Sequence, residues 1–86
     1  MNKDDLTNMI SRVFFEVFSQ QHPDLTPPHL ERDTVLLETG LDSLGFAVLV
    51  TRLEEELGYD PFSLSSNAFY PRTFGEFVDF YQEEAP

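Results

Sequence analysis

Apolar side chains recur along the first twenty residues at the spacing of an α-helix. Asp4 and Asp5 occupy what would be the first turn, where acidic groups interact favourably with the positive end of the helix dipole. The pattern predicts a helix over about residues 3–20. Phe15 points away from the apolar stripe, so it either contacts a neighbouring segment or is exposed. The stripe comprises Leu6, Met9, Ile10, Val13, Phe14 and Val17.

Residues 21–42 form a long connection without helical periodicity. His22-Pro23 and Thr26-Pro27-Pro28 exclude a regular helix there. A loop of this length inside a compact domain is unusual and indicates a functional reason. We expect apolar anchors to hold it against the helices: Leu25, Leu30, Val35, Leu36 and Leu37.

The next segment predicts a helix over about residues 43–57, with Asp42 as its N-cap and Gly58 ending it. This helix has two apolar faces. One is an ordinary core face of Phe46, Leu49, Val50, Leu53 and Leu57. The other consists of Leu44, Ala47, Val48 and Thr51, bordered by Glu54 and Glu55. An apolar surface rimmed by acids is typical of a docking site for other proteins. The alternative is that the first helix or the long loop covers this second face.

The C-terminal part predicts two more helical segments. Asp60-Pro61 begins a turn, and a short helix follows over about residues 65–69. The last helix covers about residues 73–82, with Thr73 and Glu76 spaced as a capping box. No alternating pattern indicates a strand. The expected fold class is therefore all-α, a single domain over residues 1–86 built as a small bundle of three main helices plus one short helix.

Composition narrows the function classes. Five Lys and Arg face sixteen Asp and Glu, for a net charge of −11, which disfavours binding to nucleic acid or anionic membranes. Such an acidic domain fits basic patches on partner proteins, although the charge alone also explains solubility. Cys is absent, and no segment reaches the about 18–20 apolar residues that cross a bilayer. We expect a cytoplasmic monomer without a signal peptide.

Ser43 is the residue with a possible chemical role. A serine before an apolar run is often only a helix cap. As a catalytic nucleophile it would need a nearby base, and His22 and His29 are both more simply loop residues. We find no Gly-rich phosphate loop, no metal-ligand spacing and no calcium-binding loop. The chain is expected to be non-catalytic and to bind no metal.

The wider context of this serine resembles the modification site of the acyl carrier protein family. The motif Gly40-Leu41-Asp42-Ser43-Leu44 precedes an amphipathic helix that ends in Leu53-Glu54-Glu55-Glu56-Leu57-Gly58. The long preceding loop, the chain length, the acidity and the closing helix also match the family's layout. The resemblance thus covers nearly the whole chain.

The resemblance implies a four-helix acyl-carrier-protein-like bundle that becomes a phosphoprotein. Ser43 would receive 4'-phosphopantetheine from coenzyme A through a phosphopantetheinyl transferase, and Asp42 would belong to the transferase's recognition signal. The arm's thiol would hold an acyl or related intermediate as a thioester, as in fatty acid or polyketide biosynthesis. An acyl-loading ligase or acyltransferase, and downstream synthase or transferase enzymes, would be further partners. They would dock on Leu44, Ala47, Val48, Thr51, Glu54 and Glu55.

One difference from the usual sequence of fatty-acid carriers favours a role in a specialised pathway. Fatty-acid carriers usually present acids near the start of this helix, where Gly45 and Val48 stand here. Two alternatives stay open at this point. The chain is either a modified carrier or an unmodified acidic adaptor that docks partners through its second helix. The acyl chain is either enclosed between the helices or excluded by Phe14, Phe46, Phe74 and Phe77.

Overall fold

The computed structural model of the chain describes residues 2–65 and 70–86. In this described part the regular elements are all helical, which confirms the expected fold class of three longer helices and one short helix. The elements in chain order are α1 (Lys3–Gln21), a 3₁₀ turn (Leu36–Glu38), α2 (Ser43–Leu57), α3 (Pro61–Leu64) and α4 (Phe74–Glu83).

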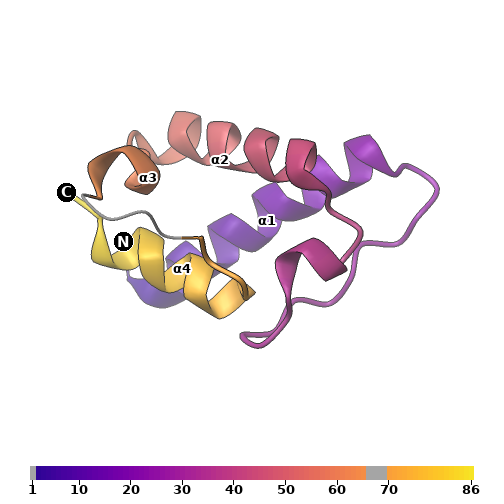
Figure 1. Cartoon of the computed structure of the whole chain (residues 1–86), viewed down its shortest axis with the longest axis horizontal. Coiled ribbons are helices and arrows are strands. Elements are labelled where there is room, and N and C mark those ends of the chain that lie inside the picture. The colour runs from indigo at the N-terminus through magenta and orange to yellow at the C-terminus, as the bar shows by residue number, and fades with distance from the viewer. Residues whose placement is uncertain (1, 66–69) are drawn as a thin grey trace.

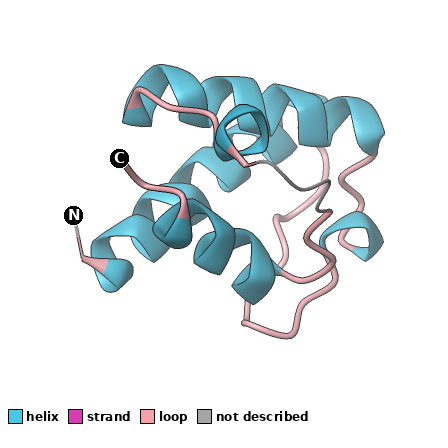
Figure 2. Cartoon of the chain, turned by 60° about the vertical axis from the view of Figure 1, so that its left-hand side comes forward, coloured by secondary structure: helices cyan, strands magenta, loops and turns pink. Residues whose placement is uncertain are grey.

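Helix α1 is the central element of the bundle. It packs against both α2 and α4, and Figure 1 shows these two helices on different sides of it. The side chain of Asn2 caps α1 by accepting a hydrogen bond from the amide of Asp5 at 2.8 Å, a cap that the sequence pattern did not reveal. Both chain ends lie at the same end of the molecule (Figures 1 and 2).

The core lies where the three longer helices meet. Phe18 belongs to the buried stripe of α1, one residue beyond the expected pattern, whereas Met9 is only partly buried. Phe15 is partly buried and packs against the core, so it is not an exposed residue, and its ring meets that of Phe14 in the same helix edge-on at 6.0 Å. The fully buried side chains include Ile10, Val13, Phe14, Leu49, Leu53, Phe77 and Tyr81.

The connection between α1 and α2 wraps around the end of the bundle and is fixed to α4 through its backbone. Phe74 and Gly75 donate amide hydrogen bonds to the carbonyls of Thr34 (2.8 Å) and Arg32 (2.9 Å). These bonds satisfy amides that the first turn of a helix leaves without intrahelical partners. Val35 also forms an isolated antiparallel bridge with Thr73.

Only part of the expected apolar anchoring of this loop is present. Leu36 is 1% exposed, and Leu30 packs partly against the core. Leu25 and Leu37, however, are 55% and 59% exposed, so the expectation that they anchor the loop was wrong. Leu41, also 1% exposed, supplies the missing anchor directly before α2. The loop needs few apolar anchors because its backbone hydrogen bonds already attach it to α4.

The described residues contain a short helix, α3, at a place where the sequence predicted only a turn. Asp60 caps α3 by accepting from the amide of Phe62 at 2.9 Å, and Pro61 occupies the first turn, where its missing N–H costs nothing. Of the short helix expected over 65–69, residues 66–69 lie outside the described part, and Ser65 is the C-cap of α3. The expected turn at Asp60-Pro61 is thus the start of a helix.

Helix α4 begins at the predicted cap with one difference. Thr73 accepts from the amide of Glu76 at 3.2 Å, as a capping box requires. The Glu76 carboxylate accepts from the Thr73 hydroxyl at 3.1 Å instead of reaching the Thr73 amide. None of the helices in the described residues is both long and apolar enough to cross a membrane.

Candidate functional site

Ser43 is the first residue of α2, and its side chain is exposed. The residues before it fix the backbone at this point. Leu41 is buried in the core, and the Asp42 carboxylate accepts a hydrogen bond from the amide of Gly45 at 2.7 Å. The predicted N-cap is therefore present, and Ser43 lies one residue inside it. The arrangement presents an accessible hydroxyl on a rigid backbone.

Neither histidine is arranged as the base of a serine nucleophile. The Nε2 atom of His22 is hydrogen-bonded to the carbonyl oxygen of Gly40 at 3.0 Å, which ties the end of α1 to the loop before Ser43. His29 lies on the exposed loop, 3.8 Å from a carboxylate oxygen of Glu31. Among the residues that the structure describes, no side chain hydrogen-bonds to the Ser43 hydroxyl. The hydroxyl is thus open to a reagent from outside.

The second apolar face of α2 is open to solvent. Leu44 is 68% exposed and Val48 is 36% exposed, and Ala47 and Thr51 are exposed beside them. The opposite face, led by the fully buried Leu49 and Leu53, packs into the core. These exposures exclude the alternative in which α1 or the long loop covers the second face.

The three glutamates near this face differ in whether they form an ion pair within the fold. Glu54 and Glu55 are exposed and form no ion pair with any described residue. The next residue, Glu56, instead binds Arg12 of α1 at 2.6 Å. Of the three consecutive glutamates, two therefore face outward with free carboxylates, and the third holds α2 to α1.

Gly45 does not lie on the open face of α2. From the sequence it was expected at a surface position where fatty-acid carriers usually present an acid. Gly45 is buried, and a Cβ atom there would meet the Gln21 side chain and approach the Leu41 Cδ1 atom to 2.6 Å. An acidic residue has no room at this position because the end of α1 packs directly against the first turn of α2.

A pocket of about 480 Å³ opens beside Ser43. Sequence reasoning missed it because its walls come from three separate segments. They are Leu36 and Leu37 from the 3₁₀ turn, Ser43 and Phe46 from α2, and Tyr70, Pro71 and Arg72 from the segment before α4. No local pattern reveals that residues 70–72 lie near residue 43.

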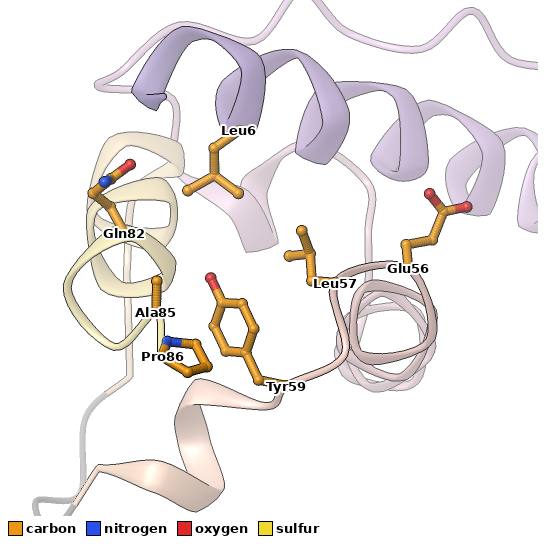
Figure 3. Close-up of a pocket in the computed structure, with 7 residues that line it drawn as sticks. All are labelled: Leu6, Glu56, Leu57, Tyr59, Gln82, Ala85 and Pro86. Carbon is orange, nitrogen blue, oxygen red and sulfur yellow. The ribbon is translucent and has the colours of Figure 1, made fainter. Parts of the chain in front are cut away.

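A second pocket, of about 360 Å³, lies near the C-terminal end of α2, on the side away from Ser43. Figure 3 shows the Tyr59 ring standing between Leu57 and Pro86. The Tyr59 hydroxyl donates to the Tyr81 carbonyl at 2.7 Å, and burial raises the Tyr59 pKa above its ordinary value. With its hydroxyl committed to the fold, Tyr59 is a structural residue.

Comparison with protein families decides what kind of domain this is. A family model described as a phosphopantetheine attachment site matches residues 23–80, which is more than half of the chain. The chain belongs to this family. It is a carrier domain, and its cofactor is covalently attached 4'-phosphopantetheine. No curated protein and no solved structure matches the chain.

The matched region of this carrier domain begins after α1 and ends within α4. It therefore contains the long loop, Ser43 and the pocket beside it. Helix α1 lies outside the match, yet six of its side chains are buried in the core. The family match thus covers the long loop, α2, α3 and most of α4, and α1 packs against α2 and α4 from outside the match.

Proposed function

We propose that Ser43 is the attachment point of 4'-phosphopantetheine, and that the chain carries acyl or related intermediates as thioesters in a specialised biosynthetic pathway. The observation that carries this proposal is the exposure of the Ser43 hydroxyl at the start of α2, inside the matched family region. The Asp42-Ser43-Leu44 motif and the open pocket support the same assignment.

The surroundings of Ser43 fit a phosphodiester. The first turn of a helix presents free N–H groups and the positive end of the helix dipole, and both favour a bound phosphate. The first turn of α2 contains no acidic residue, although the chain carries a net charge of −11. A phosphate attached here meets no carboxylate from the first turn itself, although the N-cap residue Asp42 precedes Ser43 directly.

The protein's contribution is to hold the root of the arm and to present it. The arm supplies a thiol that bears the cargo, so the absence of Cys from the chain is compatible with thioester chemistry. Leu41 and the Asp42 cap keep the backbone of Ser43 in place, so that a flexible arm extends from a rigid point. Because none of the described side chains is hydrogen-bonded to the Ser43 hydroxyl as a base would be, the transferase must provide the group that activates it.

The open face of α2 is the proposed landing surface for partner enzymes. A phosphopantetheinyl transferase would read Asp42 together with this face, and a loading ligase or acyltransferase and downstream synthases or transferases would use the face in turn. Its apolar centre and free carboxylates provide contact area and attraction to basic patches. The face comprises Leu44, Ala47, Val48, Thr51, Glu54 and Glu55.

The proposal of a specialised pathway rests on the chemistry of this face. Val48 places an apolar group where fatty-acid carriers usually present an acid, and position 45 cannot hold one. Early docking contacts on α2 are therefore more apolar and depend less on charge steering. Such a surface suits a dedicated set of enzymes.

The decisive experiment is intact mass spectrometry after incubation with coenzyme A and a promiscuous phosphopantetheinyl transferase. We expect the mass to increase by one phosphopantetheine in the wild type and not in Ser43→Ala. Ser19→Ala, a matched change at an exposed serine of α1, should be modified like the wild type. An unmodified wild type, under conditions that load a control carrier, would favour the adaptor that docks partners without a cofactor.

A further inference from the structure

Within the part of the chain that the structure describes, one basic side chain has no acidic partner. The chain has five Lys and Arg against sixteen Asp and Glu. Four of the five form ion pairs within the fold: Lys3 and Arg32 with Asp79, Arg12 with Glu16 and Glu56, and Arg52 with Glu16. Arg72 forms none with any residue in the described ranges 2–65 and 70–86. With acids so abundant, an unpaired cation needs an explanation.

Arg72 lines the same pocket as Ser43. Its backbone is held in place, because its carbonyl accepts a hydrogen bond from the amide of Leu36 at 3.1 Å. The bridge between Val35 and Thr73 holds the next residue to the same loop. Arg72 therefore has a long, exposed side chain on a backbone that is fixed beside the pocket.

Among the described residues that line this pocket, Arg72 is charged and none is acidic. The first turn of α2 has no acid. The Asp42 carboxylate, next to Ser43 in sequence, keeps its negative charge but is hydrogen-bonded to the Gly45 amide and does not line the pocket. Arg72 adds a guanidinium, whose planar donor fork matches the oxygens of a phosphate in a two-point contact.

We propose that Arg72 binds the phosphodiester of the phosphopantetheine arm on Ser43 and holds the proximal part of the arm in the pocket between partner encounters. This inference rests on the proposed function of Ser43. The apolar wall formed by Leu36, Leu37 and Phe46 faces the carbon segment next to the phosphate, which bears two methyl groups. Arg72 is a positioning residue in this assignment and takes no part in the chemistry of the cargo.

The strength of this contact is limited by exposure. Solvent-exposed ion pairs shift an equilibrium by about two- to fivefold, and salt weakens them. The arm is thus held loosely enough for a docking enzyme to draw it out. We expect the bound fraction of the arm to fall by about this factor when the guanidinium is removed.

The test uses the modified full-length protein and NMR observation of the arm. Mass spectrometry first establishes that each variant carries the arm on Ser43. The phosphorus chemical shift and the mobility of an isotope-labelled arm are then compared among the wild type, Arg72→Gln and Arg72→Lys. Lys3→Gln is the charge-matched control, because it removes one positive charge from the start of α1 and leaves the pocket intact.

The expected result is a shifted phosphorus signal and a more mobile arm in Arg72→Gln, an intermediate effect in Arg72→Lys, and no change in Lys3→Gln. A phosphorus signal and arm mobility in modified Arg72→Gln equal to those of the wild type would overturn the inference while leaving Ser43 as the attachment point. A wild type that gains no mass would remove the proposed function, and this inference with it.

A second measurement covers the case in which Arg72→Gln folds or loads poorly. The Nε–Hε signal of Arg72 is compared between the unmodified and the modified wild type. A shift confined to Arg72, with the signals of Arg12 and Arg32 unchanged, supports the contact. An Arg72 signal that stays in place on modification contradicts it.

Discussion

The amide of Gly75 donates a hydrogen bond to the carbonyl oxygen of Arg32 at 2.9 Å, and a Cβ atom at position 75 would lie 2.8 Å from that same oxygen. Glycine is therefore required where the long loop meets the first turn of α4. This contact belongs to the set of backbone hydrogen bonds that holds the long loop to the start of α4. Residues of the long loop and of the segment directly before α4 line the pocket next to Ser43.

Gly75→Ala should destabilise the domain in spite of alanine's better helix propensity. Alanine gains about 1 kcal/mol in a helix, whereas overpacking against a fixed neighbour costs about 1–3 kcal/mol, and here the neighbour is a backbone atom. We expect a net loss of about 1 kcal/mol in the free energy of unfolding, measured in urea. Gln82→Ala, on the exposed side of α4, is the control and should change little.

Substitutions of Asp42 separate its capping role from its proposed recognition role. Asparagine caps a helix as well as aspartate does, so Asp42→Asn should keep the free energy of unfolding but lower the rate of phosphopantetheine transfer. Asp42→Ala should lose about 1 kcal/mol of stability as well, because the Gly45 amide loses its acceptor. The measurements are urea unfolding and the initial rate of mass gain. Transfer to Asp42→Asn at the wild-type rate would exclude the charge from recognition.

Val48→Glu tests the open face of α2. Because Val48 is 36% exposed, the substitution should change the free energy of unfolding by less than about 0.5 kcal/mol. Transfer by the phosphopantetheinyl transferase should nevertheless slow by about tenfold, since a central apolar contact is lost. Ser19→Glu adds the same charge to an exposed position of α1 and is the matched control. Equal kcat/KM values for the two variants would argue against docking on this face.

Asp79 should contribute to stability in a pH-dependent manner. Hydrogen bonds from Arg32 and Lys3 hold the pKa of the Asp79 carboxyl below its ordinary value of 3.8. A lowered folded-state pKa means that the contribution is complete above the unfolded-state value and is lost as the pH falls through the folded-state value. We expect the wild type to lose more unfolding free energy than Asp79→Asn between about pH 5 and pH 2.

The control for Asp79 is Asp33→Asn, at an exposed loop position without an ion pair to any described residue. Its acid sensitivity should equal that of the wild type. If Asp79→Asn shows the same acid sensitivity as well, the ion pairs with Lys3 and Arg32 do not stabilise the fold.

Two tyrosines should respond to loss of the hydroxyl with opposite signs. The Tyr81 hydroxyl is buried without a hydrogen-bond partner among the described residues, and burial raises its pKa above the ordinary value of 10.0. Tyr81→Phe should therefore increase the free energy of unfolding by about 1 kcal/mol. Tyr59→Phe should decrease it by about 1 kcal/mol, because it removes the bond to the Tyr81 carbonyl. Thermal and urea unfolding measure both, and a destabilised Tyr81→Phe would indicate that the hydroxyl has a partner.

Local sequence was sufficient for features that depend on neighbouring residues. Hydrogen bonds and spacing within a few residues account for the helical class, the Asp42 cap, the end of α2 at Gly58 and the two faces of α2. The exposed Ser43 is of this kind, because a residue at the start of a capped helix is held by the cap and not by distant packing. Helix α3 was missed because Asp60-Pro61 is compatible with either a turn or a helix start.

Features that join distant segments were decided only by the tertiary structure. The packing of the loop against α4 decides whether Leu37 is buried or exposed and whether Arg72 lines the pocket of Ser43. The packing of α1 against α2 decides whether Gly45 faces the core. A sequence pattern states which face of a helix is apolar but not which segment will cover it. The chain by itself thus determined its three longer helices and the exposed hydroxyl of Ser43. Packing determined the surroundings of that hydroxyl, because these come from residues far apart in sequence.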